Sequence, residues 1–269
     1  MEFARPLGPP VRVGGETWRA ATHIEGTYSI DRVDTDARAQ CGAEAFGFFC
    51  AALAVLDPGE LDVLIPGFHD FDARLAQLER ALADDAAGRA GEVCEEADTC
   101  RGQIALGRAL HEAQNELPPR VCHNDTKINN LLFDEQDHRP RAVVDLDTCM
   151  PGWWMHDFGD IVRTFCSPEE EDSLRLDRVA VREDVFHAVC GGFTGPLAGH
   201  LSPAERESLW LGARAIPLIV GLRFLTDHVA GDRYFRISRP GQNLDRTRNQ
   251  LALYRDLTAR ENTLRPHLS

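Results

Sequence analysis

The sequence contains a single lysine, Lys127, and its other fixed positive charges are all carried by arginine. Acidic residues outnumber basic ones, so the formal net charge is −14. This surplus of negative charge argues against non-specific binding to nucleic acid or to an anionic membrane surface, because both need clustered positive charge. It does not argue against phosphorylated small ligands, since a bound metal and a local site can outweigh the global field.

Paired cysteines and long apolar runs are also scarce. None of the eight cysteines forms a CxxC pair, and Cys94 and Cys100 lack zinc-finger spacing. The first residues, MEFARPLGPPVRVGGE, contain no apolar signal region, and we expect no stretch of the chain to span a bilayer. At 43% hydrophobic residues, the chain can bury a sizeable core. These features predict a cytoplasmic enzyme whose cysteines are reduced and serve as small buried side chains.

Hydrophobic periodicity predicts a mostly helical chain with two small strand pairs. The first pair is a hairpin in which VRV and ETWRAATHI flank the turn Gly14-Gly15. The second pair comprises residues 131–133 and 141–147. A helix is expected to start at Asp157, which would be its N-cap. Other helices are expected over residues 33–56, 71–82, 102–117, 182–193, 203–225 and 243–260.

The segment VCHNDTKINNLLFD, residues 121–134, crowds polar side chains between two short apolar ends and holds the sole lysine. His123, Asp125 and Asn130 have the H-x-D-x-x-x-x-N spacing of a kinase catalytic loop. Phosphoryl transfer needs a carboxylate to take the acceptor's proton, oxygen ligands for Mg²⁺, and a cation near the moving group. Asp125 suits the first role and Lys127 the third. A plain solvated loop is the weaker interpretation, because a helix precedes the segment and a strand pair follows it.

Carboxylates that could hold a metal are expected at the end of that strand pair. Asp145 and Asp147 would lie on one strand face, so both could point at a single metal cluster. The literal kinase triplet Asp157-Phe158-Gly159 follows a further loop. We therefore predict that Asp157 caps a helix and that Phe158 packs beside it, and we place the metal site at Asp145.

The segments HNDTKINNLLFD, VVDLDTCMPG and DFGDIVR together resemble the aminoglycoside phosphotransferase/choline kinase-like superfamily. RFLTDHVAGDRYFRI and NLDRTRNQ resemble in particular the N-acetylhexosamine 1-kinases, which phosphorylate the anomeric hydroxyl of an N-acetylhexosamine. The resemblance implies an α+β, protein-kinase-like fold, with Mg²⁺ as cofactor and ATP as co-substrate. It also implies roles for single residues: Asp125 as catalytic base facing the sugar, Asn130 and Asp145 as metal ligands with Asp147 close by, His123 as a structural brace, Asp160 as a tie between the next helix and the loop, and Arg223 and Tyr234 as sugar contacts.

Three of the aromatic and basic residues have structural alternatives. Arg223 could pair with Asp227, four residues further along one helix. Tyr234 could be a half-buried core aromatic. Trp153 and Trp154 are expected to pack in the core rather than to form a sugar platform.

A complete kinase of this kind begins with a small lobe, which carries a glycine-rich loop and a strand lysine. The sequence contains no G-x-G-x-x-G motif, and Lys127 is already assigned to the catalytic loop. Residues 1–26 resemble the last strands of that lobe and the hinge, where the backbone of Ile24 and Glu25 would bind adenine. Residues 27–269 resemble the helical large lobe. Such a truncated chain would bind ATP poorly, turn over slowly, and expose apolar side chains of its hairpin.

The leading hypothesis is an ATP-dependent phosphotransferase that acts on a sugar hydroxyl. A kinase of the same fold that acts on an aminoglycoside, choline or homoserine is the second, and a non-catalytic sugar-binding remnant is the third. A metal-dependent hydrolase is weaker still, because no second histidine has the helical spacing needed to join His123 and Asp125 on zinc. The expected partners are a small-molecule sugar and ATP, without nucleic acid or membrane.

Overall fold

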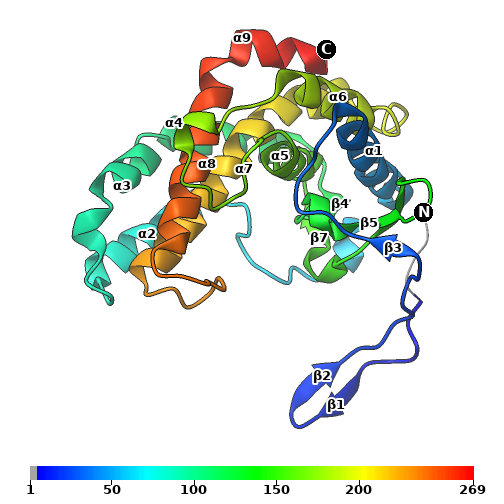
Figure 1. The fold of residues 1–269 in the computed structure, drawn as a ribbon, viewed down its shortest axis with the longest axis horizontal. Helices are drawn as coiled ribbons and strands as arrows, with labels where there is room; N and C mark the ends of the chain where they lie inside the picture. Colours follow the sequence, from blue (N-terminus) through cyan, green and yellow to red (C-terminus); the bar gives the residue numbers. More distant parts are fainter. Residues whose placement is uncertain (1–4) are drawn as a thin grey trace.

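The computed structural model describes residues 5–269, which form a helical body with three small sheets (Figure 1). The helices are α1 (Asp36–Leu53), α2 (Phe71–Asp84), α3 (Cys94–Arg101), α4 (Ile104–Glu116), α5 (Trp154–Phe165), α6 (Glu183–Thr194), α7 (Pro203–Val229), α8 (Gln242–Ala259) and α9 (Glu261–Leu264). The strands are β1 (Val11–Val13), β2 (Glu16–Trp18), β3 (Thr27–Tyr28), β4 (Arg120–Cys122), β5 (Leu131–Asp134), β6 (Pro140–Val143) and β7 (Met150–Gly152).

Side chains fix the starts of several helices. Thr35 and Asp70 each accept a hydrogen bond from a backbone N–H in the first turn of α1 and α2. Ser202 and Glu205 form the capping box predicted for α7. The predicted ranges of α1, α2, α4, α6 and α8 agree closely with these helices. Helix α3 was not predicted, because its short and highly charged sequence shows little apolar periodicity.

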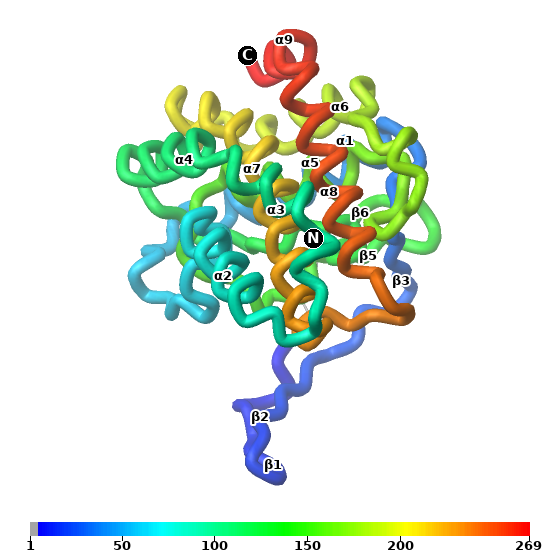
Figure 2. The backbone as a smooth tube through the Cα atoms, turned by 90° about the vertical axis from the view of Figure 1, so that its left-hand side faces the viewer, coloured from blue at the N-terminus to red at the C-terminus, as the bar shows by residue number. Residues whose placement is uncertain are grey.

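Helix α7 lies at the centre of the body and packs against α2, α5 and α8 (Figures 1 and 2). By length and composition it could cross a membrane, so the expectation that no stretch could do so was wrong. Most of that stretch is buried inside the protein, with Leu218, Ile219 and Leu222 fully covered. This burial is typical of the core helix of a globular domain.

Helices α5 and α7 cross closely at a pair of glycines. A Cβ atom on Gly159 would lie 2.3 Å from the carbonyl oxygen of Gly212. A Cβ atom on Gly212 would lie 1.9 Å from the carbonyl oxygen of Met155. Both contacts are sterically forbidden, so a larger residue at either position would force the helices apart. Phe158, beside this crossing, is fully buried, as predicted.

Two small sheets hold the two ends of the polar segment. β5 pairs with β6 as predicted, and β3 adds to β5 on its other side. A further antiparallel pair, β4 with β7, was not predicted; it places Cys122, near the start of the segment, opposite Met150. Strands of three residues are too short for alternation to be detected in the sequence.

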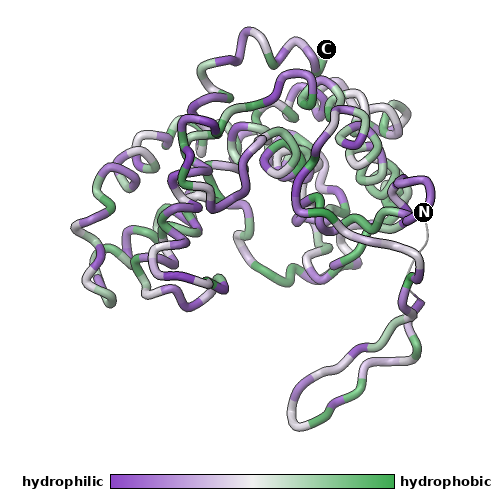
Figure 3. Tube along the Cα trace, in the orientation of Figure 1, coloured by the Kyte–Doolittle hydropathy of each residue, from purple (hydrophilic) through white to green (hydrophobic). Residues whose placement is uncertain are grey.

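β1 and β2 form the predicted hairpin, which projects from the helical body (Figures 1 and 2). Gly14 and Gly15 both have positive φ, at 61° and 89°, as a two-residue hairpin turn favours. All of its strand residues are exposed, including Val11, Val13 and Trp18. Apolar stretches of the hairpin therefore lie in the open, as expected (Figure 3).

All eight cysteines are free thiols. Cys94 is exposed, so the expectation of burial was wrong for that residue. Cys41 and Cys149 are partly buried, and the buried ones are Cys50, Cys100, Cys122, Cys166 and Cys190.

Candidate active site

Residues 123–130 of the polar segment form a loop between β4 and β5, which ends in a 3-10 turn. Within it, Nζ of Lys127 lies 2.6 Å from Oδ2 of Asp125 and 3.9 Å from Oδ2 of Asp145. The side-chain amide of Asn130 donates to the backbone carbonyl of Asp125 at 2.8 Å and to its Oδ2 at 3.0 Å. The fold thus brings Asp125, Lys127, Asn130 and Asp145 together, although Asp145 lies outside the loop, beyond the end of β6.

Lys127 is a positive charge held between carboxylates. Burial by itself would lower the pKa of its ammonium group. Asp125, through its charge and its hydrogen bond, and Asp145 and Asp160, through their charges, outweigh burial and raise the pKa above its ordinary value. Lys127 is therefore fully charged at neutral pH.

Asp145 and Asp147 do not share a strand face, so that prediction was wrong. Asp145 lies beyond the end of β6 in the left-handed conformation, with φ 61° and ψ 53°. The chain then enters the 3-10 turn Leu146–Thr148, which breaks the alternation of a strand. Asp147 consequently turns outward, where it forms an exposed ion pair with Arg19.

His123 lies where the prediction of a structural brace requires. Its ring is fully buried and contacts two phenylalanine rings of α1 edge-on. Nε2 lies 3.0 Å from the carbonyl oxygen of Val144 and donates to it, and Oγ1 of Thr148 donates to the carbonyl of His123 at 2.7 Å. These bonds hold the turn that carries Asp145 against the catalytic loop.

Asp157 anchors the loop from the side of α5. Its carboxylate accepts the backbone N–H of His123 at 3.0 Å and that of Asn124 at 2.7 Å. The hydroxyl of Thr126 donates to its backbone carbonyl at 2.6 Å. Because α5 already begins at Trp154, Asp157 is not the N-cap, and that prediction was wrong. The N–H groups of the loop, rather than those of its own helix, satisfy the carboxylate.

Burial raises the pKa of the Asp157 carboxyl to about 6, although the charge of His123 and the two backbone donors pull the pKa down. The thiol of Cys50 also faces this carboxylate, with Sγ 3.6 Å from Oδ2. In the Asp-Phe-Gly triplet, Asp157 therefore anchors the loop and Phe158 packs in the core. Gly159 permits the close crossing with α7 described above.

Asp157 makes the hydrogen bonds from α5 to the loop, and Asp160, to which the resemblance gave that tie, acts on Lys127 through its charge. Nε of Arg163 donates to Oδ1 of Asp160 at 2.8 Å, while Oδ2 is buried without a hydrogen-bond partner among residues 5–269. Burial, together with the nearby charge of Asp125, raises the pKa of Asp160, while Arg163 counteracts this. Asp160 faces the cavity described next.

A cavity of about 360 Å³ opens beside the catalytic loop. Asp125 and Lys127 line one part of it, and Arg223 of α7 and Tyr234 of the following loop line another. The structure thus joins the predicted catalytic and sugar-contacting residues across a long stretch of sequence. Asp160, named from the sequence, also lines the cavity, and other lining residues were not predicted, among them Phe68, His69, Arg163 and Arg246.

Arg223 does not pair with Asp227, so the structural alternative for it was wrong. The carboxylate of Asp227 accepts three successive backbone N–H groups of residues 233–235. Arg223 instead lies over the ring of Phe68, with its guanidinium carbon 4.5 Å from the ring centroid. Tyr234 is 67% exposed, so it is not a core aromatic. Asp227, in the last turn of α7, therefore orders the loop that follows through these three hydrogen bonds.

The remaining predicted residues lie apart from this cavity. The carbonyl oxygen of Ile24 accepts the hydroxyl of Thr27 at 2.8 Å, and that of Glu25 accepts a guanidinium N–H of Arg141 at 3.2 Å. Neither residue lines the cavity that contains Asp125, and their binding of adenine stays a prediction. Trp154 is buried in the core, as predicted.

Comparison with known proteins identifies the family. The model of the phosphotransferase enzyme family known as APH matches residues 4–193. The chain belongs to this family. Its structure is similar to an ethanolamine kinase from Plasmodium vivax, with a TM-score of 0.59 and 12% identity over 90% of this chain and 68% of that chain. It is also similar to choline kinase from Cryptosporidium parvum Iowa II, with a TM-score of 0.53 and 14% identity over 96% of this chain and 76% of that chain.

These comparisons confirm the protein-kinase-like fold and the enzyme class. The protein is a kinase or phosphotransferase that acts on a small molecule. At such low identities the two solved structures establish the fold, and the acceptor has to be argued from the residues of this chain.

The donor set at the loop suits Mg²⁺. Asn130 and Asp145 offer amide and carboxylate oxygens, which this ion prefers to sulfur or imidazole. The Asp145 side chain is 51% exposed, so its oxygens are accessible. Within residues 5–269, no group of three or more histidine, cysteine, aspartate and glutamate residues is arranged to hold a metal alone. Such a small number of protein ligands is typical of Mg²⁺ sites in which nucleotide phosphates complete the coordination.

Proposed function

We propose that this phosphotransferase moves the γ-phosphoryl group of ATP to a sugar hydroxyl, and that the hydroxyl is the anomeric one of an N-acetylhexosamine. The observation that carries the proposal is the cavity shared by Asp125, Lys127, Arg223 and Tyr234. A carboxylate base lies at one part of it, while a guanidinium and a phenol, both donors to sugar oxygens, lie at another.

The chemistry assigns one step to each group of the loop. The acceptor hydroxyl hydrogen-bonds to the carboxylate of Asp125, which takes its proton. The hydroxyl oxygen then forms a bond to the γ-phosphorus as the bond from that phosphorus to the leaving ADP oxygen breaks. Lys127, fixed as a cation beside Asp125, stabilises the negative charge on the transferring group.

Asn130 and Asp145 would hold Mg²⁺, which when bound neutralises charge on the phosphate oxygens. Asn130 has a second duty in this scheme. Its amide N–H groups already fix the carboxylate of Asp125 through Oδ2, so it orients the base for the acceptor. The hydrogen bonds of His123 and Asp157 keep this arrangement rigid without contacting the substrate.

An assay with Mg-ATP and N-acetylglucosamine tests the proposal, with ADP release and sugar 1-phosphate formation measured together. We expect ADP release that depends on the sugar, because the phosphoryl group moves to an acceptor hydroxyl held by Asp125. ADP release without sugar phosphate, or with choline, homoserine or an aminoglycoside in place of the sugar, would contradict the acceptor.

A further inference from the structure

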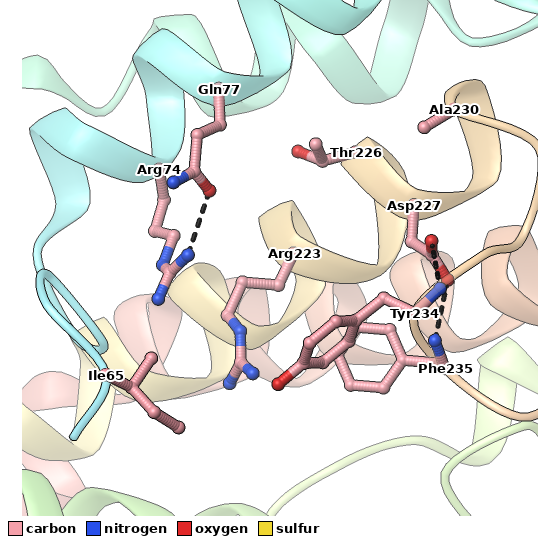
Figure 4. A pocket seen from close by; sticks show the side chains of 9 residues that line it. All are labelled: Ile65, Arg74, Gln77, Arg223, Thr226, Asp227, Ala230, Tyr234 and Phe235. Atoms are coloured by element: carbon pink, nitrogen blue, oxygen red, sulfur yellow. Dashed lines mark hydrogen bonds between the residues drawn. The ribbon is translucent and has the colours of Figure 1, made fainter. Parts of the chain in front are cut away.

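Two arginine side chains at the far end of the cavity lack a carboxylate partner. Arg74 of α2 and Arg223 of α7 point into the same space, beside the hydroxyl of Tyr234 (Figure 4). Arg74 donates to the carbonyl of Phe68 at 3.2 Å and to the amide oxygen of Gln77 at 2.9 Å. Arg223 stacks over aromatic rings. Among residues 5–269, neither guanidinium forms an ion pair with an acidic side chain.

Burial lowers the pKa of Arg74 although the charge of Asp70 acts against this, and neither Asp70 nor Asp227 forms an ion pair with Arg74 or Arg223. Asp70 caps α2 by accepting a backbone N–H at 3.0 Å. Asp227 accepts three backbone N–H groups and, at 3.0 Å, the side-chain amide of Asn243. Burial and the charge of Arg74 both lower the pKa of Arg223. Two partly buried guanidinium groups side by side repel each other unless an anion compensates them.

In the part of the cavity nearer the catalytic loop, by contrast, two arginines have acidic side chains beside them. Arg163 forms ion pairs with Asp160 and Glu171, and Nε of Arg246 lies 3.7 Å from Oε2 of Glu171. Arg236 also lines the larger cavity and forms no ion pair among residues 5–269, whereas two such guanidinium groups, those of Arg74 and Arg223, lie in the part lined with Tyr234. That part is a space of about 220 Å³, which shares Ile65, Arg223, Tyr234 and Phe235 with the larger cavity.

We infer that the acceptor carries an anionic group, which binds to Arg74 and Arg223 while its hydroxyl faces Asp125. The inference rests on the proposed phosphotransfer and narrows its acceptor to N-acetylhexosamines that also bear a carboxylate or a phosphate, so that neutral N-acetylglucosamine serves in the assay as an uncharged analogue. A planar guanidinium binds either group through two parallel hydrogen bonds, and two guanidinium groups add a second pair. A cationic acceptor such as choline would meet repulsion at the same place.

Pairs of sugars that differ mainly in charge test this inference. Calorimetric titration of the full chain, without ATP, compares glucuronate with glucose, galacturonate with galactose, and glucose 6-phosphate with glucose. We expect at least one charged sugar of these pairs to bind about tenfold more tightly than its neutral partner, because hydrogen bonds to charged groups are strong. The first two pairs report a carboxylate and the third reports a phosphate.

Arg74→Gln should reduce that preference about tenfold, and Arg74→Lys should restore part of it. Arg80→Gln is the matched control, because Arg80 lies exposed on the same helix. Thermal melting of each variant checks that it is folded. The inference is wrong if every neutral sugar binds as tightly as its charged partner, or if Arg74→Gln and Arg80→Gln behave alike.

Because binding is measured without ATP, this result is separate from the proposed activity. A protein that binds the charged sugars through Arg74 but releases no ADP refutes the phosphotransfer and leaves the anion site standing. A protein that phosphorylates neutral N-acetylglucosamine and is indifferent to charge refutes the anion site alone.

Discussion

The catalytic loop and the β1–β2 hairpin are both short local motifs, yet the loop is largely buried and the hairpin is exposed. The loop is buried at His123, Asn124 and Thr126, and each of these residues hydrogen-bonds to a distant part of the chain. The strand residues of the hairpin are all exposed. The difference teaches that a motif is positioned by its buried partners, and that local pattern specifies only its internal shape.

The largest effect is expected at the centre of the loop. Asp125→Asn removes the proton acceptor, so kcat should fall about 10²–10⁴-fold, as is typical when a general base is lost. Steady-state kinetics with the best acceptor measures this. Asp62→Asn, at an exposed aspartate, is the control and should retain the activity of the parent. A fall of less than tenfold would remove Asp125 from the role of base.

The anchoring of the loop is tested by Asp157→Ala. The substitution leaves the buried N–H groups of His123 and Asn124 without acceptors, at roughly 1–3 kcal/mol each. The free energy of unfolding, measured in urea, should therefore fall by about 2–6 kcal/mol. Asp157→Asn keeps one acceptor oxygen and should lose less. Equal losses for both variants would mean that the hydrogen bonds to the loop do not account for the anchoring.

The free energy of unfolding should depend on pH through a histidine in the buried surroundings of the loop, a kind of group that the exposed hairpin strands do not contain. His156 accepts a hydrogen bond from Gln114, and its ring lies 5.0 Å from that of His69, which donates to the carbonyl of Asn124. Burial lowers the pKa of His156 to about 4. The unfolded chain, with a histidine pKa near 6.5, binds more protons between these values, so the stability contributed by neutral His156 falls as pH drops.

Between pH 7 and pH 5 this loss amounts to about 2 kcal/mol. Urea unfolding at both pH values, for the parent and for His156→Gln, measures it. His69, whose pKa is lowered by burial and by the charge of His156, titrates in both proteins. The variant should lose about 2 kcal/mol less than the parent. Parallel losses would show that His156 does not titrate in this way.

The smallest effect is expected in the hairpin. Val13→Thr adds a hydroxyl to an exposed side chain, so the free energy of unfolding should change by less than about 0.5 kcal/mol. The matched variant is Val121→Thr in β4, next to the loop, where the side chain is 4% exposed. It should cost roughly 1–3 kcal/mol, because the hydroxyl is buried. Similar changes in the free energy of unfolding for Val13→Thr and Val121→Thr would contradict the difference between hairpin and loop.

Much of the fold could be predicted because its signals are local. The capping box of α7, the periodicity of α2 and the Gly14-Gly15 turn each depend on residues close in sequence. The β4–β7 pair could not be predicted, because three residues carry no readable alternation. The prediction that Asp145 and Asp147 share a strand face was wrong, because Asp145, which follows β6, has a left-handed backbone conformation.

The sequence by itself determined the catalytic constellation, because His123, Asp125, Lys127 and Asn130 lie within eight positions and one loop can hold them together. The tertiary structure alone decided which acidic residue of α5 anchors that loop. It also decided that Arg74 and Arg223 meet beside Tyr234. The periodicity of a helix specifies which face is buried but not which helix will cover it, so contacts between α2 and α7 emerge only when the core is packed.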